Sequence, residues 1–77
     1  MSTEPIRVLL EQAFPDAAEL LVIDRGGGDH LEVRVTAPSL NGLSLIDQHR
    51  KVNAVLGDLV KDGTIHELRI KTKGTGS

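Results

Sequence analysis

Two consecutive segments decide the fold of this chain: Gly42-Leu-Ser-Leu-Ile-Asp-Gln-His-Arg-Lys-Val-Asn-Ala-Val-Leu-Gly-Asp-Leu59, and then Ile65-His-Glu-Leu-Arg-Ile-Lys-Thr72. Ser44, with Asp47 three residues later, resembles a capping box in which Asp replaces the commoner Glu, so a helix is predicted to begin here. Gly63 is well placed as the left-handed residue that ends this helix. The apolar positions that recur at helical spacing are Leu45, His49, Val52, Leu56, Leu59 and Val60.

The residues after this helix predict a strand. Thr64 to Thr72 alternate in character, and Leu68 and Ile70 would share one face of the strand with His66. The last residues, 73–77, are rich in glycine and are expected to form a frayed tail.

Before the central helix, the pattern predicts a first helix and a hairpin. Thr3 is expected to cap a helix over about residues 4–14, with Pro5 tolerated in its first turn and Pro15 closing it. The apolar run 20–23 predicts a strand, and alternation over 31–36 predicts a second. The glycine-rich loop 24–29 joins them. The predicted inner face of the first helix consists of Ile6, Leu9, Leu10, Ala13 and Phe14.

The predicted order is helix, strand, strand, helix, strand, in a single domain over residues 1–77. This order indicates an α+β fold, a two-layer sandwich in which both helices cover one face of a three-stranded mixed sheet. The hairpin makes the first two strands antiparallel, and the helical crossover favours a right-handed parallel pairing of the second and third strands. Because parallel neighbours begin at the same edge, His30 and His66 are expected to lie close together.

Composition limits the possible functions. The 77 residues contain no cysteine, so the chain supplies no thiolate for catalysis or for a metal. A net charge of -2 disfavours generic nucleic-acid binding, and a single aromatic residue, Phe14, removes the stacking platforms of single-strand binders. No signal peptide or membrane span is recognisable. We therefore expect a cytoplasmic protein that makes no membrane contact and is a monomer in isolation.

Several motifs favour structural rather than catalytic interpretations. The glycines at 26–28 lead into a strand, whereas a phosphate-binding loop needs glycines that lead into a helix. The G-x-x-G clamp of KH modules is absent, although the order of elements resembles theirs. The chain has no nucleophile elbow and no H-E-x-x-H helix, so we expect no enzymatic activity.

The three histidines carry different expectations. His49 lies on the predicted apolar stripe of the central helix, where a histidine is more often a hydrogen-bonded structural residue than a ligand. His30 and His66 each open a strand and are not needed to fill a core. Two neutral imidazoles at one sheet edge could bind a borderline metal, but they fill only half of a tetrahedral site. The alternative is a pair of exposed titratable side chains.

Several short segments of the sequence, in a fixed order, resemble those of a known family. The similarity is carried by Gly42-Leu-Ser44, by Gln48-His-Arg50 followed by Val52-Asn-Ala54, and by Ile65-His66 running into Lys71-Thr72. Phe14-Pro15 and Gly28-Asp-His30 also match. Together these segments resemble the BolA family, in its small form with a histidine in the loop before the second strand, over about residues 6–72.

The resemblance implies a fold related to type II KH modules and a partnership with a monothiol glutaredoxin around a shared [2Fe-2S] cluster. The family's metal ligands correspond here to His30 and His66, with glutaredoxin and its glutathione supplying the two thiolates. No cofactor is expected in the isolated chain. Imidazole in place of thiolate raises the reduction potential of such a cluster, as it does in Rieske centres. An adaptor for iron sensing or cluster transfer is therefore expected.

The family also offers an alternative function, a DNA-binding transcription regulator connected with stress responses. The cations that would serve on the central helix and the last strand are Arg50, Lys51, Arg69, Lys71 and Lys73. The chain departs from the family's pattern in two ways. Gln48 stands where the family often has a basic residue, which weakens the DNA-binding alternative. Residues 73–77 stand where the family often has a T-P-x-x-W segment, and this departure bears on the partner contacts that such a segment makes. Only weak, salt-sensitive DNA contact is expected.

Overall fold

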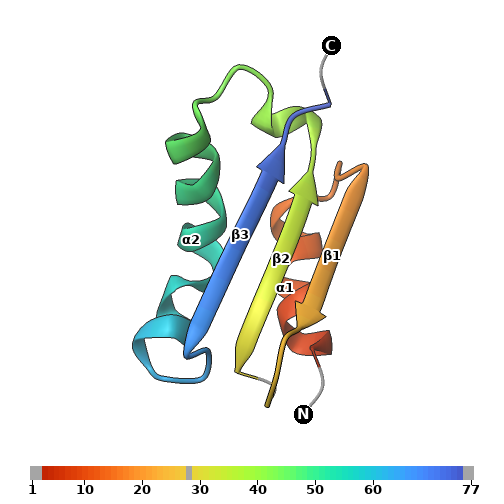
Figure 1. Cartoon of the computed structure of the whole chain (residues 1–77). Helices are drawn as coiled ribbons and strands as arrows, with labels where there is room; N and C mark the ends of the chain where they lie inside the picture. The colour runs from red at the N-terminus through yellow and green to blue at the C-terminus, as the bar shows by residue number, and fades with distance from the viewer. Residues whose placement is uncertain (1–2, 28, 76–77) are drawn as a thin grey trace.

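The computed structural model describes residues 3–27 and 29–75, and it confirms the predicted order of elements (Figure 1). A short 3-10 helix, which was not predicted, follows the second strand. The elements are α1 (Glu4–Ala13), β1 (Glu19–Asp24), β2 (His30–Thr36), η1 (Pro38–Leu40), α2 (Leu45–Lys61) and β3 (Glu67–Lys73).

The three strands form one mixed sheet in the order β1-β2-β3. β1 pairs antiparallel with β2, and Val22 lies opposite Val33. β2 pairs parallel with β3, and its first residue, His30, lies opposite Glu67. Both predicted pairings are confirmed. As a result, β2 and β3 begin at the same edge of the sheet, where α2 leads back into β3 (Figure 1).

Both helices cover the same face of the sheet, as predicted (Figure 1). The central strand contributes Leu31, Val33 and Val35, each at most 1% exposed. Because Phe14 is the only aromatic side chain, aliphatic packing builds the core. The buried apolar residues are Ile6, Leu10, Phe14, Leu31, Val33, Val35, Ala37, Leu40, Val52, Leu56 and Ile65.

The two helices differ in how their first turns are capped. The Ser44 hydroxyl accepts a hydrogen bond from the Asp47 backbone N–H at 3.2 Å, which confirms the predicted cap of α2. Thr3 occupies the N-cap position of α1, but its side chain makes no capping hydrogen bond, so that part of the prediction was wrong. The Thr3 backbone is in the right-handed helical region, whereas a capping residue typically has extended backbone, as Ser44 does.

This difference gives a prediction for paired variants. Ser44→Ala leaves an amide N–H of the first turn without its partner and is expected to lower the free energy of unfolding by about 0.5–2 kcal/mol. Thr3→Ala removes a hydroxyl from the same helix position without breaking a cap and is expected to change it by less than about 0.5 kcal/mol. Urea unfolding followed by circular dichroism measures both, and equal losses would contradict the assignment of the cap.

Some residues of the predicted apolar stripes are exposed. Leu45 is 62% exposed and Val60 is 40% exposed, although Val52 and Leu56 in the middle of α2 are fully buried. On α1, Leu9 is likewise exposed at 38%, and Ala13 is exposed as well. Helical spacing indicates which side of a helix faces the core, but not how far the core extends along the helix axis.

The last strand begins later and ends later than predicted. Residues 64–66 form a bend, and only Glu67 begins β3. Gly63, with a φ of 85°, is the left-handed residue that ends α2, as expected. Lys73 belongs to β3, and Asn41 Nδ2 donates to Thr75 Oγ1 at 3.1 Å. The prediction of a frayed tail is therefore wrong for residues 73–75, and residues 76–77 lie outside the described part.

Among the described residues, neither helix combines the length and the apolar character that crossing a lipid bilayer requires.

Candidate metal centre

The edge at which β2 and β3 begin brings the two candidate ligands together. His30 is the first residue of β2, and His66 directly precedes β3. The Asp29 carbonyl oxygen accepts hydrogen bonds from the backbone N–H of His66 at 2.8 Å and of Glu67 at 3.1 Å. These two bonds tie the start of β3 to the residue before β2. The predicted proximity of His30 and His66 is thereby confirmed.

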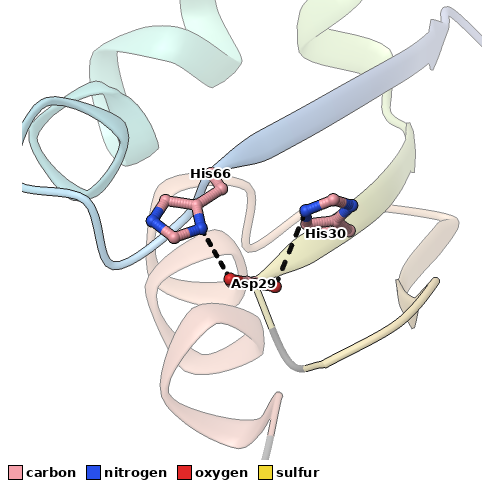
Figure 2. Close-up of side chains that lie close together, drawn as sticks. All are labelled: Asp29, His30 and His66. Atoms are coloured by element: carbon pink, nitrogen blue, oxygen red, sulfur yellow. Dashed lines mark ion pairs between the residues drawn. The ribbon is translucent and has the colours of Figure 1, made fainter.

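A carboxylate lies between the two imidazoles (Figure 2). Asp29 Oδ2 is 2.6 Å from His66 Nδ1, and Asp29 Oδ1 is 3.8 Å from His30 Nε2. One potential ligand atom from each of the three side chains lies within 4.8 Å of the other two. The arrangement therefore offers two imidazole nitrogens and one carboxylate at a single point.

The sequence-based prediction did not include Asp29. Its only signal in the sequence is its position at the end of the glycine-rich loop, directly before His30. An acidic residue in a glycine-rich turn is unremarkable by itself, because Asp is common in turns. Asp29 becomes a candidate ligand only because the parallel pairing places the start of β3, and with it His66, against this turn.

These side chains are accessible from solvent. The exposed fractions are 49% for the His30 side chain, 64% for His66 and 31% for Asp29. A shallow open depression adjoins His30, and its lining consists of Arg25, His30, Leu31, Glu67 and Arg69. A partner protein can therefore approach both imidazoles without any rearrangement of the core.

Beside this edge, Glu32 is buried on the sheet face that the helices do not cover. It is 2% exposed, and its carboxylate lies 2.7 Å from Arg34 Nε and 3.5 Å from Arg25 Nη1. The hydrogen bond from Arg34 is the largest effect and lowers the pKa of Glu32, with smaller contributions from the charges of Lys71, Arg34 and Arg25. Desolvation opposes these effects without reversing them.

This lowered pKa predicts a dependence of stability on pH. A carboxylate whose pKa is lower in the folded state stabilises the fold above its unfolded value of 4.5, and the benefit disappears as the pH falls through the folded value. At pH 7 the parent is therefore expected to unfold at a higher midpoint concentration of urea than the Glu32→Gln variant. This difference between the two midpoints is expected to shrink at pH 3. Glu11→Gln, at an exposed pair with Arg7, controls for the loss of one charge. A constant difference across this range would contradict the prediction.

His49 is separate from the metal centre. It is half-buried on α2 and does not belong to the cluster formed by the described residues Asp29, His30 and His66. The structural interpretation of His49 therefore stays a prediction.

The five candidate DNA-binding cations do not share one surface. Arg69, Lys71 and Lys73 alternate along β3 with partly buried residues, so they point to the face of the sheet opposite the helices. Arg50 and Lys51 are exposed on α2, which covers the other face. Arg50 Nη1 also lies 3.4 Å from Asp47 Oδ1, and Arg69 Nε lies 3.3 Å from Glu67 Oε1. A duplex lying on one side of the molecule would meet only part of the set.

Gln48, the residue on α2 that departs from the pattern of the resemblance, has a local structural role. Its side-chain amide donates to the backbone carbonyl of Leu43 at 3.1 Å and approaches that of Leu40 at 3.5 Å. The side chain thus stabilises the turn before α2.

Comparison with known proteins agrees with this architecture. The model of the BolA-like protein family matches residues 11–76. Protein BOLA2 of Arabidopsis thaliana is 38% identical over 67 residues, which cover 87% of this chain and 70% of that protein. The RP812 protein of Rickettsia prowazekii is 31% identical over 72 residues, 94% of this chain and 92% of the relative. The solved BolA domain of SufE1 from Arabidopsis thaliana has a TM-score of 0.82 at 32% identity, covering 94% of this chain and 90% of that one. The chain belongs to the BolA family.

Proposed function

We propose that this protein is an adaptor that binds a monothiol glutaredoxin and co-ligates a [2Fe-2S] cluster through His30 and His66, for iron sensing or cluster transfer. The observation that carries the proposal is the juxtaposition of these two exposed imidazoles where β2 and β3 begin. Family membership supports the same conclusion, since His30 and His66 occupy the positions that correspond to the metal ligands of the BolA family.

The donor set fits a shared cluster better than one held by this chain alone. A [2Fe-2S] cluster needs four protein or thiol ligands, which are usually cysteine thiolates. This chain has no cysteine and brings two imidazoles to the edge. A glutaredoxin thiolate and a glutathione thiolate would complete the set. When bound, the cluster supplies iron and sulfide for transfer, or a redox-sensitive group for sensing.

Asp29 has a defined role in this arrangement. Asp29 Oδ2 lies 2.6 Å from His66 Nδ1, so a proton carried on Nδ1 would face the carboxylate and leave Nε2 as the nitrogen that binds iron. Metal-bound histidines commonly donate their other N–H to a carboxylate in this way. Asp29 would therefore act as an outer-shell partner that fixes the tautomer and the ring orientation of His66.

Titration of the chain into cluster-loaded monothiol glutaredoxin tests the proposal. We expect a saturable change in visible absorption and circular dichroism as imidazole enters the coordination shell. A DNA mobility-shift assay at two salt concentrations, run in parallel, tests the alternative regulator function. An unchanged visible spectrum, with steep salt-dependent and sequence-selective DNA binding, would overturn the proposal in favour of the regulator.

The regulator function remains the weaker alternative. Its cations are divided between the two sides of the sheet, and the net charge is -2. Phosphate contacts dominate the affinity of DNA-binding proteins and require several cations on one surface.

A further inference from the structure

The centre formed by Asp29, His30 and His66 contains a third donor that a shared cluster would not use as a ligand. Asp29 presents one carboxylate oxygen to each imidazole, at 2.6 Å from His66 Nδ1 and 3.8 Å from His30 Nε2 (Figure 2). The facing atoms are therefore a carboxylate oxygen, one Nδ1 and one Nε2. Two imidazoles with one carboxylate form a donor set that suits zinc and related divalent transition metals.

Glu67 gives His30 a preferred ligand nitrogen. Its Oε2 lies 3.4 Å from His30 Nδ1, on the opposite side of the ring from Asp29. A proton on Nδ1 would face this carboxylate and leave Nε2, which lies 3.8 Å from Asp29 Oδ1, as the nitrogen that binds the ion. This is the carboxylate–histidine–metal arrangement that orients ligands in metalloproteins.

The backbone holds the three residues in place. Two N–H groups at the start of β3 donate to the Asp29 carbonyl, and parallel pairing continues from His30 opposite Glu67. Only the side chains must move to enclose an ion. Ligand atoms at about 2.0–2.2 Å from one tetrahedral ion lie roughly 3.3–3.6 Å apart. Rotation of three side chains that are not packed in the core would bring the donor atoms, now within 4.8 Å of one another, to this spacing, with the 2.6 Å separation of Asp29 Oδ2 and His66 Nδ1 widening.

We infer that the chain by itself binds one divalent transition-metal ion of the zinc class through the Asp29 carboxylate, His30 Nε2 and His66 Nδ1. A fourth position, open to water, follows from the exposure of both imidazoles. This inference does not depend on the glutaredoxin proposal. The two modes exclude each other, because they use the same imidazoles. In the mononuclear mode Asp29 changes from outer-shell partner to ligand, and His66 binds through Nδ1 with its proton on Nε2 instead of the reverse.

Titration of the untagged chain with Co²⁺, which gives visible ligand-field bands, tests the inference, and displacement by Zn²⁺ confirms the class. We expect one ion per chain and no competition by Mg²⁺, which prefers all-oxygen sites. Asp29→Asn is expected to weaken Co²⁺ binding by more than the roughly 10–100-fold that follows loss of an outer-shell partner. Glu67→Gln is expected to weaken it within that range. His49→Gln, which removes an imidazole elsewhere, is expected to leave it unchanged.

The outcomes separate this inference from the proposed function. Because Asp29 is an outer-shell partner in the shared cluster and a ligand in the mononuclear site, a larger loss of Co²⁺ affinity than of glutaredoxin-dependent cluster affinity in Asp29→Asn supports the mononuclear site. Two results would overturn it: no Co²⁺ bands with the folded parent, or parent-like bands with Asp29→Asn. Neither result bears on the shared cluster, whose test is the glutaredoxin titration. Backbone amide spectra of each variant show whether the fold is intact.

Discussion

In the glutaredoxin complex, the His66→Ala variant is expected to lose the visible absorption and circular dichroism signature that the parent gives with the shared cluster. Alanine offers no donor atom, and the chain has no cysteine that could replace the imidazole. Loss of an outer-shell partner already costs about 10–100-fold in metal affinity. Loss of a ligand is therefore expected to weaken the cluster-dependent complex by more than about 100-fold, measured by titration under anaerobic conditions.

His30→Ala is expected to have a comparable effect, because each imidazole supplies one of the two donors from this chain. His49→Ala is the matched control, since it removes the histidine on α2 that does not belong to the centre. If the His30 and His66 variants both reproduced the spectrum of the parent, the proposed ligand set would be wrong.

A third variant distinguishes a ligand from a structural role. His66→Cys is expected to keep the cluster but to lower its reduction potential, because thiolate ligation gives lower potentials than imidazole ligation. A redox titration of the complex measures the change. A purely structural histidine would give no such shift.

Leu56→Ala is expected to cause the largest loss of stability that we predict. Leu56 is fully buried in the middle of α2, and truncation of such a leucine costs about 2–5 kcal/mol. A small domain has little stability to lose, since the free energy of unfolding of native proteins is only about 5–15 kcal/mol. At roughly 4–8 °C per kcal/mol, the melting temperature should fall by at least about 8 °C.

Leu45→Ala is the matched control on the same helix. It removes the same atoms from a side chain that is 62% exposed, and it is expected to change the free energy of unfolding by less than about 0.5 kcal/mol. Thermal and urea unfolding of both variants measure the difference. Equal losses would show that the whole predicted stripe is buried, in conflict with the structure.

Leu45 and Leu56 also show that apolar spacing alone does not predict which residues of a helix are buried. Both residues fit the apolar spacing of α2, but only one is buried. Thr3 and Ser44 show a similar contrast, because both are good capping residues and only Ser44 accepts the capping hydrogen bond. Composition and spacing do not reveal how far a neighbouring element extends or which backbone conformation the capping residue adopts.

The sequence by itself determined the order of elements, the hairpin, the parallel crossover and the positions of His30 and His66. It could do so because turn residues, apolar period and crossover length are local properties that restrict the topology strongly. The tertiary structure decided the role of Asp29, the burial of Glu32 among arginines and the division of the cations between two sides of the sheet. Each of these depends on which residues distant in sequence lie beside one another in the sheet, a relation set by strand register.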